Sequence, residues 1–482
     1  MKVPTLLDKH TFCIEDQYLF AEISGDYNPM HLDPVIARRE KFGEVVVHGV
    51  YSLTKCLNAF VRHIKNGGIE SIVLDNVSAK FPNPVFLNKE VSNYLINDDP
   101  LNTVIGVFDG KMLLTEFTFS YLESDVLDEV ELENSVIKEV QIKDEEIEKM
   151  NDCKGIYSFT LDKNILNKLF PDLSSGFSQE LIATFFSLTR LVGMECPGRQ
   201  SIFSSFKLKQ HITVNQEPGH IKFQTIRAIP KYHKIDISVQ TNKYVGKLNT
   251  FYRPKPIKQE GAEEVKVLVD PICYRNHVAL IVGGSRGLGE MTAKIISAGG
   301  GHSIITYYQG EKDARNLCKE ITDSGGKCAA QYFDVQSPSK LFDFLNHENI
   351  RPTHIYYFAT GKIFQPREHL FEMDQFQTFS NVYLKSFFEL YSKYRELWPN
   401  QHVNIFYPSS VLAGAQTKLV EYSLSKVAGE NLCKHLQEND KNLNIYIERL
   451  PGISTDQNLG FNYQELDSPL TIMTAVLEKM RK

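Results

Sequence analysis

Several features that would define a protein class are missing from this chain of 482 residues. No run of the sequence approaches the roughly 18 consecutive apolar residues of a membrane-spanning helix. The N-terminal segment has no long apolar core behind a basic start, so we expect no signal peptide and a cytoplasmic protein. The net charge of -6 shows no excess of basic residues, and the composition therefore does not favour nucleic-acid binding.

Cysteine is also sparse: the eight cysteines are scattered and no C-x-x-C occurs. Because metal-ligand spacing is absent, we predict no metal site. A disulfide framework is not expected in so large a chain, and the thiols are predicted to be buried or idle. The hydrophobic share of 42% is that of a globular protein, and the length predicts two to four domains.

The stretch that is richest in chemistry is SGDYNPMHLDP, residues 24–34, which is followed by VVVHG at residues 45–49. Its proline and its Asp and Asn residues predict a loop. Asp26 and His31 lie five positions apart in this loop and can point into one small volume. An acid and an imidazole placed together suit the addition of water to a carbon–carbon double bond, or its removal.

An apolar helix is predicted to begin at Gly49 and to end at the glycines 67 and 68. Its apolar residues have the spacing of one buried face: Val50, Leu53, Leu57, Phe60, Val61 and Ile64. The free amides at the start of this helix, including that of Gly49, can receive negative charge that develops on a thioester oxygen. Strand-like runs follow up to about residue 122, and an acidic connection with a short strand at 136–142 is predicted after them.

Residues 151 to about 255 repeat the order of a helix followed by strands. Ser178 is predicted to cap a helix that runs through Val192, with Gly193 just past its end. This part has no D-x4-H, so we predict a degenerate partner domain rather than a second active site of the same kind. A linker rich in proline and charge is predicted at 253–264.

The C-terminal part contains a glycine-rich turn between an apolar strand and a helix. Gly283, Gly287 and Gly289 give a G-x3-G-x-G spacing, which suits the close approach of a pyrophosphate to the backbone. Further on, Tyr422 and Lys426 lie at i and i+4, so both are expected on one helix face. A lysine ammonium beside a phenol favours the phenolate and prepares it for proton transfer to a carbonyl or hydroxyl oxygen.

The N-terminal motifs resemble those of MaoC-like dehydratases and (R)-specific enoyl-CoA hydratases, which have the hot-dog fold. The matching pattern is F-A-E-x-S-G-D-x-N-P-x-H-x-D-P, then F-G, then V-H-G, over roughly the first quarter of the chain. The resemblance implies that Asp26 and His31 are the catalytic pair and that Gly49 gives an oxyanion-binding amide.

Residues 276–455 resemble the short-chain dehydrogenase/reductases, especially the 3-oxoacyl-thioester reductases. The resemblance implies that Tyr422 is the general acid/base, that Lys426 binds the nicotinamide ribose, and that Ser410 orients the substrate. Ser409 stays a candidate for that serine, and Asn381 falls at the family's proton-relay asparagine. The implied cofactor-binding residues are Gly283, Ser285, Arg286, Gly287, Leu288, Gly289, Asp334, Val335, Tyr422, Lys426, Pro451, Gly452 and Thr455.

The sequence departs from this second family at two points. The Ser–Tyr spacing is one residue short if Ser410 is the serine, and the family's N-N-A-G reads Phe358-Ala-Thr-Gly361 here. Two asparagines that brace the central sheet in the family are thereby lost. The preferred cofactor is NADP(H): no acid follows the second strand to bind ribose hydroxyls, and Arg286 can pair with a 2′-phosphate.

We therefore predict a double hot-dog N-terminal half of the α+β class, followed by an α/β Rossmann-fold domain. The predicted domains are residues 1–125, 126–258 and 265–482. The predicted function is a bifunctional 3-oxoacyl-thioester reductase and 3-hydroxyacyl-thioester dehydratase that acts on acyl-CoA or on an acyl-carrier protein. The alternative is an active reductase with a non-catalytic, acyl-binding or dimerising hot-dog pair. Both families usually self-associate, so a homo-oligomer is expected.

Overall fold

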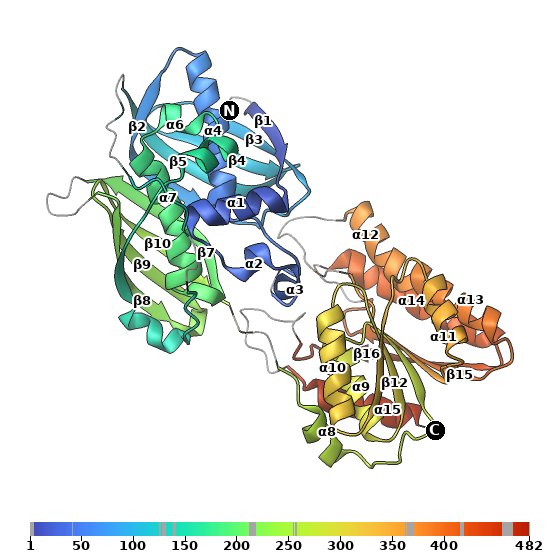
Figure 1. The fold of residues 1–482 in the computed structure, drawn as a ribbon. Helices are drawn as coiled ribbons and strands as arrows, with labels where there is room; N and C mark the ends of the chain where they lie inside the picture. Colours follow the sequence, from blue (N-terminus) through green and yellow to red (C-terminus); the bar gives the residue numbers. More distant parts are fainter. Residues whose placement is uncertain are drawn as a thin grey trace. The chain divides into compact units, whose positions relative to one another are not determined.

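The computed structural model describes residues 4–40, 42–124, 127, 132–137, 141–211, 218–253, 255, 258–361, 363, 371–414, 419–455 and 466–481. The chain forms two compact units, Met1–Lys255 and Pro256–Lys482 (Figure 1). The domain borders predicted from the sequence, at residues 125/126, 258 and 265, stay predictions.

One ten-stranded antiparallel sheet spans the first unit, in the order β1-β3-β4-β5-β2-β7-β10-β9-β8-β6. Its strands are β1 (Thr5–Thr11), β2 (Ser71–Lys80), β3 (Glu90–Asn97), β4 (Thr103–Asp109), β5 (Met112–Ser124), β6 (Lys154–Ser158), β7 (Ser201–Gln210), β8 (His220–Ile229), β9 (Lys234–Gln240) and β10 (Tyr244–Tyr252). Read inward from either edge, the two halves show the same internal order, first-third-fourth-fifth-second. The halves meet where β2 and β7 pair, with Val77 opposite Leu208 and Ala79 opposite Phe206.

Two long helices occupy equivalent places in the two halves and lie on the same side of the sheet (Figure 1). Helix α4 (Gly49–Asn66) has the predicted bounds, and all six residues of its predicted apolar face are buried. Helix α7 (Gln179–Arg190) is capped by Ser178 as predicted. It continues into a π-helical turn, η2 (Leu191–Glu195), so Gly193 lies inside a helical turn and not past the helix end.

Shorter helices complete the first unit. They are α1 (Ile14–Ser24), α2 (Pro29–Leu32), α3 (Pro34–Ala37), η1 (Ile147–Asp152), α5 (Lys163–Leu169), α6 (Leu173–Gly176), η3 (Gly198–Gln200) and η4 (Pro230–Tyr232). Apolar residues of α1, η1, α5 and α6 join α4, α7 and the sheet in one continuous hydrophobic core.

The acidic connection forms no strand at 136–137 or 141–142, and the remainder of the predicted strand, 138–140, lies outside the described residues. The described part binds to the first unit through single contacts instead. The amide of Ile137 donates to the Glu22 carbonyl, and the Ile137 carbonyl accepts from the Tyr27 hydroxyl at 2.7 Å. An extended backbone can satisfy its polar groups on loops as well as on a strand, and here it does so.

The second unit is a six-stranded parallel sheet in the order β13-β12-β11-β14-β15-β16. The strands are β11 (Val278–Val282), β12 (His302–Tyr307), β13 (Lys327–Tyr332), β14 (His354–Tyr357), β15 (Val403–Ser410) and β16 (Leu443–Leu450). The order reverses direction between β11 and β14, which is where ligands bind in open sheets of this kind.

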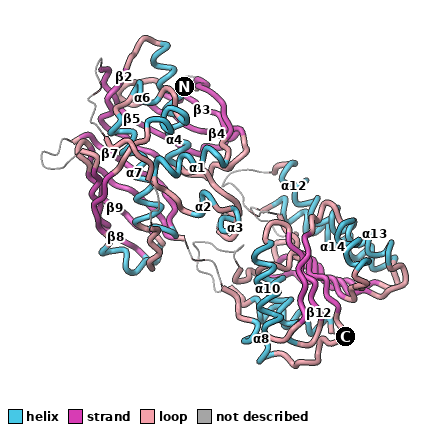
Figure 2. The backbone as a smooth tube through the Cα atoms, viewed as in Figure 1, coloured by secondary structure: helices cyan, strands magenta, loops and turns pink. Residues whose placement is uncertain are grey.

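Helices cover both faces of this sheet (Figure 2). One face packs against α8 (Ala262–Leu268), α9 (Gly287–Ala298), α10 (Glu311–Asp323) and α15 (Pro469–Met480). The other face packs against α11 (Ser339–His347), α13 (Phe387–Leu397) and α14 (Val420–Asn439), while α12 (Met373–Ser380) and the π-helical turn η5 (Asn381–Ser386) lead into α13. Helix α8 begins at Ala262, inside the segment predicted as a linker.

The predicted fold class is confirmed: an antiparallel, hot-dog-like domain is followed by a parallel Rossmann-fold domain. The near-continuous apolar strands of the second unit, such as Val278–Val282, are buried on both faces, as parallel sheets require. In the first unit the strands alternate between buried and exposed positions, because helices cover one face.

Candidate active sites

The loop that carries Asp26 is shaped by its neighbours in the sequence. Helix α1 ends at Ser24, and Gly25 adopts a positive φ of 76° that turns the chain. The Asn28 side chain caps α2 by accepting from the Met30 amide. Asp26 Oδ1 accepts from the Asn28 amide at 3.2 Å. These local bonds hold the Asp26 carboxyl in the protein interior, where its residue is 1% exposed.

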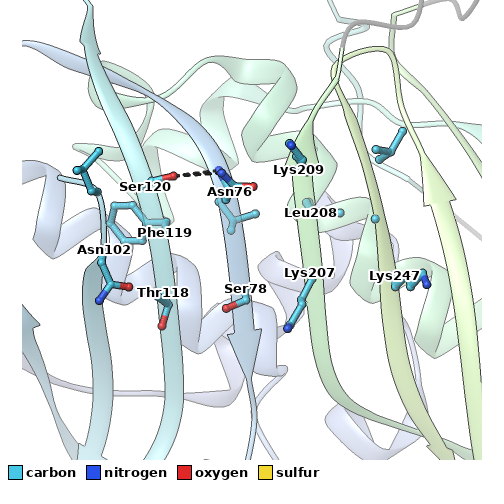
Figure 3. Close-up of a pocket in the computed structure, with 14 residues that line it drawn as sticks. Asn76, Ser78, Asn102, Thr118, Phe119, Ser120, Lys207, Leu208, Lys209 and Lys247 are labelled. Carbon is cyan, nitrogen blue, oxygen red and sulfur yellow. Dashed lines mark hydrogen bonds between the residues drawn. The ribbon is translucent and has the colours of Figure 1, made fainter. Parts of the chain in front are cut away.

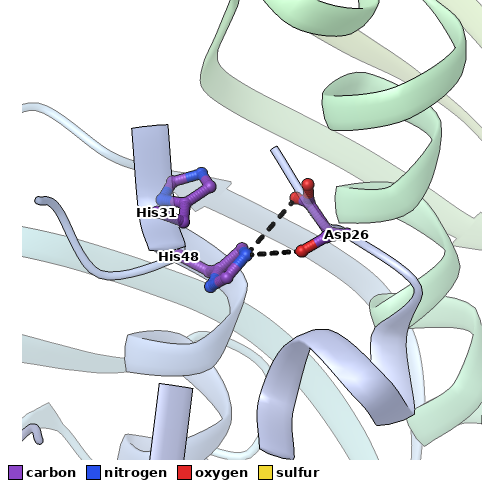
Figure 4. Close-up of side chains that lie close together, drawn as sticks. All are labelled: Asp26, His31 and His48. Atoms are coloured by element: carbon purple, nitrogen blue, oxygen red, sulfur yellow. Dashed lines mark hydrogen bonds and ion pairs between the residues drawn. The ribbon is translucent and has the colours of Figure 1, made fainter. Parts of the chain in front are cut away.

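Asp26, His31 and His48 lie together (Figure 4). The His48 Nε2–H donates to the Asp26 carbonyl at 3.0 Å and lies 3.8 Å from the carboxylate Oδ2. The rings of His31 and His48 stack with centroids 3.9 Å apart. His31 Nδ1 donates to the Val46 carbonyl at 2.8 Å, so that Nε2 is the basic nitrogen of the neutral ring. The structure thus brings the two predicted residues together and adds His48 to them.

Burial shifts the two predicted groups in opposite directions. It raises the pKa of Asp26 to about 7, against the opposing hydrogen bonds from Thr189 and the Asn28 amide. It lowers the pKa of His31 to about 4, with a further contribution from the Arg253 charge. The pKa of His48 is well below its ordinary value because of burial and of the neighbouring His31. Near neutral pH both imidazoles are therefore neutral and Asp26 is close to its midpoint.

The second half of the sheet domain contributes a wall to this site. Thr189, on α7, donates its hydroxyl to Asp26 Oδ2 at 2.6 Å. Gly193, in η2, packs against the Asp26 carboxyl so closely that a Cβ there would collide with it. The Asn28 side chain donates through Nδ2 to the Gly193 carbonyl at 3.1 Å. Gly193 thus lies in a π-helical turn, a feature that is frequent at functional sites.

Gly49 is the first residue of α4, directly after His48. A Cβ at Gly49 would lie 2.8 Å from the Phe81 ring, so glycine lets β2 and the helix start approach closely. The first amides of a helix have no intrahelical acceptor, and they carry the positive end of its dipole. The start of α4 is therefore one residue away from the Asp26–His48 contact and can stabilise a negative oxygen.

Asp26, His31 and His48 each offer one ligand atom, and these atoms lie within 4.8 Å of one another. Two of the imidazole nitrogens are already occupied, His31 Nδ1 by the Val46 carbonyl and His48 Nε2 by the Asp26 carbonyl. The predicted absence of a metal stays a prediction.

The glycine-rich turn of the second unit connects β11 to α9. Gly283 and Gly287 have positive φ values of 78° and 57°, which glycine adopts without strain. A Cβ at Gly289 would collide with the Gly283 carbonyl, so this turn closes tightly against the start of α9. Thr455 lies next to Gly287: its methyl would be 3.6 Å from a Cβ there. The predicted binding of a pyrophosphate to the backbone of this turn stays a prediction.

Two further predicted binding residues, Asp334 and Val335, come directly after β13. A small pocket of about 170 Å³ opens beside them and is lined by Tyr332, Phe333, Asp334, Ser337, Lys340 and Leu341. Asp334 Oδ1 accepts from the Gln336 amide at 2.9 Å, which fixes the start of this loop. Asp334 therefore lies at the carboxyl edge of the parallel sheet, where Gly283 and Gly287 also lie.

The two candidate serines at the end of β15 have different partners. Ser409 donates to Glu430 Oε1 at 2.5 Å, and Arg449 holds the same carboxylate through two bonds of 2.8 Å. Burial raises the pKa of Tyr422, and the neighbouring Ser410 side chain opposes this rise. Ser410 therefore lies beside the tyrosine while Ser409 is held by Glu430, and the choice between them as the substrate-orienting serine stays a prediction.

Tyr422 and Lys426 both lie on α14, as predicted. Lys426 Nζ donates to the Pro408 carbonyl at 2.8 Å and lies 3.8 Å from the centroid of the Tyr383 ring. The side chain of Asn381, which the resemblance placed at the proton relay, accepts from the Gln377 side-chain amide at 2.9 Å, and its relay role stays a prediction. Two residues later, Tyr383 occupies the position beside the lysine.

Comparison with known proteins finds one family match in each of the two units. Residues 3–99 match the family described as MaoC like domain, and residues 277–458 match the short chain dehydrogenase family. The chain joins a MaoC-like dehydratase domain to a short-chain dehydrogenase/reductase domain. The second of these domains implies a nicotinamide dinucleotide as cofactor, and the turn between β11 and α9 fits one.

Two curated enzymes are similar in sequence to the MaoC-like domain. A mitochondrial 3-hydroxyacyl-[acyl-carrier-protein] dehydratase of Arabidopsis thaliana is 30% identical over 86 residues, which are 18% of this chain and 49% of that protein. A peroxisomal hydratase-dehydrogenase-epimerase of Saccharomyces cerevisiae is 32% identical over 68 residues, or 14% of this chain and 7% of that protein. The chain thus spans about half or less of the length of these curated relatives.

The short-chain dehydrogenase/reductase domain is similar to solved structures of its family. A short-chain dehydrogenase from Burkholderia cenocepacia, in complex with NADP, is 20% identical with a TM-score of 0.37. The match covers 41% of this chain and 87% of that chain.

Sequence reasoning did not single out His48, Thr189, Gly193 or Tyr383 as site residues. The V-H-G motif could have indicated His48, because His48 directly precedes Gly49, whose amide is predicted to bind the oxyanion. Thr189 and Gly193 follow Asp26 by more than 160 positions, and no local pattern links them. Their place at the MaoC-like site comes from the packing of the two halves of the sheet domain.

A separate groove of about 520 Å³ lies on the first unit, across β5, β2, β7 and β10 (Figure 3). Lys207, Lys209 and Lys247 line it, on the side of the sheet away from the helices. None of the predicted site residues borders this groove.

In the described ranges no helix is long and apolar enough to span a membrane.

Proposed function

We propose that the chain reduces a 3-oxoacyl thioester with NADPH and then dehydrates the resulting 3-hydroxyacyl thioester. One observation carries the proposal: a buried Asp26–His31 pair and a Ser410–Tyr422–Lys426 set occur in a single chain. Their chemistries act on the same carbon, C3, in succession. Names of relatives support the thioester: besides the Arabidopsis protein, 3-hydroxyacyl-thioester dehydratase Y of Mycobacterium tuberculosis is 31% identical over 87 residues, 18% of this chain and 29% of that protein.

In the proposed dehydration, His31 Nε2 removes a proton from C2 of the 3-hydroxyacyl thioester. The free Nε2 and the lowered pKa of His31 keep this nitrogen unprotonated near neutral pH. The Asp26 carboxyl gives a proton to the leaving hydroxyl at C3, which departs as water. The Gly49 amide stabilises the charge that develops on the thioester oxygen while the C2 proton leaves.

In the proposed reduction, the dinucleotide supplies a hydride to C3 when it is bound. Tyr422 gives its hydroxyl proton to the C3 oxygen, and Ser410 hydrogen-bonds and orients that oxygen. Lys426 supports Tyr422 through its charge and binds the ribose. The backbone of Gly283, Ser285, Arg286, Gly287, Leu288 and Gly289 holds the pyrophosphate, and Asp334, Val335, Pro451, Gly452 and Thr455 border the rest of the cofactor.

NADP(H) is the proposed cofactor because of the residues around the ribose. Strand β12 ends at Tyr307, and neither Thr306, Tyr307 nor Tyr308 is an acid that would bind a free 2′-hydroxyl. Arg286, in the turn before α9, is the proposed partner of a 2′-phosphate. The acyl group is proposed to arrive on coenzyme A or on a separate carrier protein, and the two predicted catalytic domains to act in a homo-oligomer.

The test is to incubate the full chain with acetoacetyl thioesters of coenzyme A and of a carrier protein, with NADPH, and to follow the product masses. We expect the wild type to add two hydrogens and then lose one water. Tyr422→Phe should leave the substrate unchanged, and Asp26→Asn should accumulate the 3-hydroxyacyl thioester. If Asp26→Asn dehydrates as fast as the wild type, the assignment of Asp26 as the acid fails. If the wild type reduces the substrate but the product never loses water, the MaoC-like half is a non-catalytic acyl-binding module and the proposal fails.

A further inference from the structure

The lysine of the reductase site is enclosed by tyrosine rings. Lys426 is 6% exposed, and its Nζ lies 3.8 Å from the centroid of the Tyr383 ring, 5.5 Å from that of Tyr407 and 5.8 Å from that of Tyr422. The Lys426 ammonium donates one hydrogen bond to the Pro408 carbonyl. Among the described residues no carboxylate lies within ion-pair distance of this ammonium. Of these three tyrosine rings, that of Tyr383 is the nearest to the ammonium, at a distance where a cation–π contact is effective.

The Tyr383 ring is held from two sides. Its hydroxyl is 2.5 Å from the Thr360 hydroxyl, and its backbone carbonyl accepts from the Tyr407 hydroxyl at 3.0 Å. Tyr383 is 1% exposed and lies in the π-helical turn η5. Thr360 belongs to the motif Phe358-Ala-Thr-Gly361 that departs from the family pattern. The residue introduced by that departure therefore contacts the residue found beside the lysine.

We infer that Tyr383 is a positioning residue of the reductase, whose ring holds the Lys426 ammonium and whose hydroxyl is fixed by Thr360. The inference rests on the proposed role of Tyr422 and Lys426. It concerns the ring and not the hydroxyl as the part that acts on the lysine, because the ammonium lies over the ring face. Thr360 acts one step further away, through the orientation of the ring.

Lys426 can be charged or neutral near neutral pH, so contact with the Tyr383 ring can change its protonation state. Burial lowers the pKa of Lys426 to about 7, while Cys433 and Glu430 on the same helix oppose this shift. Tyr383, Tyr407 and Tyr422 face the ammonium from η5, β15 and α14. The ring quadrupole favours the charged form, so removal of the Tyr383 ring should lower the Lys426 pKa further. A neutral lysine no longer favours the Tyr422 phenolate, so the Tyr422 pKa should then rise.

The experiment compares Tyr383→Leu, Tyr383→Phe and Thr360→Val in the full chain. The first removes the ring, the second keeps the ring without its hydroxyl, and the third removes the hydroxyl's partner. Lysine labelled with carbon-13 at Cε is titrated by NMR, and the Lys426 signal is identified by its loss in Lys426→Arg. In parallel, the oxidation of a 3-hydroxybutyryl thioester with NADP+ is measured against pH.

For Tyr383→Leu we expect the Lys426 midpoint to fall by about one unit, the shift that a lost desolvated cation–π contact produces. The oxidation rate should fall about tenfold near neutral pH, with KM for the thioester unchanged, and its rising limb should move to higher pH. Tyr383→Phe and Thr360→Val both keep the ring and lose only its hydroxyl bond, so both should lie close to the wild-type titration and pH limb.

A Lys426 titration that is the same in Tyr383→Leu and the wild type overturns the inference. So does a Tyr383→Phe variant that behaves like Tyr383→Leu, because the hydroxyl would then be the active part. If the wild type does not oxidise the thioester at all, the proposed function fails while the titration still decides the inference. Stabilisation by NADPH reports that each variant is folded, and Tyr383→Met replaces Tyr383→Leu if the latter does not fold.

Discussion

At the scale of single residues, burial acts on the two titrating groups of the MaoC-like site in opposite directions. The Asp26 pKa is raised to about 7 and the His31 pKa is lowered to about 4. The order of the two values is thereby inverted relative to ordinary side chains. Between them, the pair holds one proton, on the acid, which is the state that the proposed dehydration requires.

The pH dependence of dehydration follows from this inversion. We expect the rate to rise as His31 loses its proton near pH 4 and to fall as Asp26 loses its proton near pH 7. The measurement is kcat/KM for a 3-hydroxyacyl thioester across this range in the full chain. A rate that keeps rising well above the Asp26 midpoint would contradict the assignment of Asp26 as the acid.

The raised Asp26 pKa also predicts a cost in stability. Unfolded Asp ionises near its ordinary pKa of 3.8, whereas the folded group stays protonated until about 7. As pH rises between these values the unfolded state binds fewer protons than the folded state, so folding becomes less favourable, on the order of a few kcal/mol. Asp26→Asn lacks this loss. Its Tm, measured relative to the wild type, should increase between about pH 4 and about pH 7.

Ser409 and Ser410 offer a matched pair of substitutions. Ser410→Ala should lower kcat of the reduction about 100-fold, because a hydrogen bond to the reacting oxygen is lost. Ser409→Ala should leave kcat unchanged and lower the free energy of unfolding by about 1 kcal/mol, through its lost bond to Glu430. Kinetics and denaturant unfolding of both variants check this. The opposite ranking of the two kcat values would return Ser409 to the site.

At the scale of elements, the π-helical turn η2 decides the shape of the MaoC-like site. It brings Gly193 against the Asp26 carboxyl, while Thr189 on the preceding α7 donates to the same carboxyl. The half of the sheet domain that lacks a D-x4-H therefore contributes two residues that contact the Asp26 carboxyl of the other half. Its role is support of the carboxyl, and its sequence need not repeat the catalytic motif.

Gly193→Ala should displace the Asp26 carboxyl and lower dehydration about 100-fold, since small displacements of a reacting group have effects of this size. Thr189→Val is the milder variant: it removes a hydrogen bond that favours ionised Asp26, so the falling limb of the pH profile should move to higher pH. The reductase rate of the same samples is the internal control. Full dehydratase activity in Gly193→Ala would show that η2 does not support the site.

At the scale of the whole molecule, the two units carry separate machinery. The dinucleotide turn, the Ser410–Tyr422–Lys426 set and the Asp334 pocket all belong to the second unit. A ligand stabilises the part of a protein that binds it. A nicotinamide dinucleotide is therefore expected to act on the unfolding of Pro256–Lys482.

In a thermal-shift experiment, NADPH should raise the unfolding temperature of the second unit more than NADH at equal concentration. Arg286→Ala should reduce the difference, because the 2′-phosphate loses its charged partner. Stabilisation by NADH alone would contradict the assignment of NADPH and would favour the oxidative direction. Asp26→Asn is the matched control, since it changes the other unit and should leave the response to both dinucleotides unchanged.

The local parts of the structure were predictable from the sequence. The bounds of α4 followed from its apolar spacing and from the glycines after it, and the glycine-rich turn from its place between a strand and a helix. Asp26 and His31 were also within reach, because five residues of one loop carry both. The strand expected at 136–142 is absent from its described residues 136–137 and 141–142, and the place predicted for Gly193 was wrong, since both depend on what packs against the segment.

The sequence by itself determined the two fold classes and the side chains that can perform each reaction, because periodicity and short motifs are local properties. Only the tertiary structure decided which of these groups meet. It joined Thr189 and Gly193 to Asp26, placed Ser409 against Glu430 and Ser410 beside Tyr422, and placed the Tyr383 ring against Lys426. The physical reason is burial: the contacts that set these charges join residues far apart in the chain, and they form only when the core closes around them.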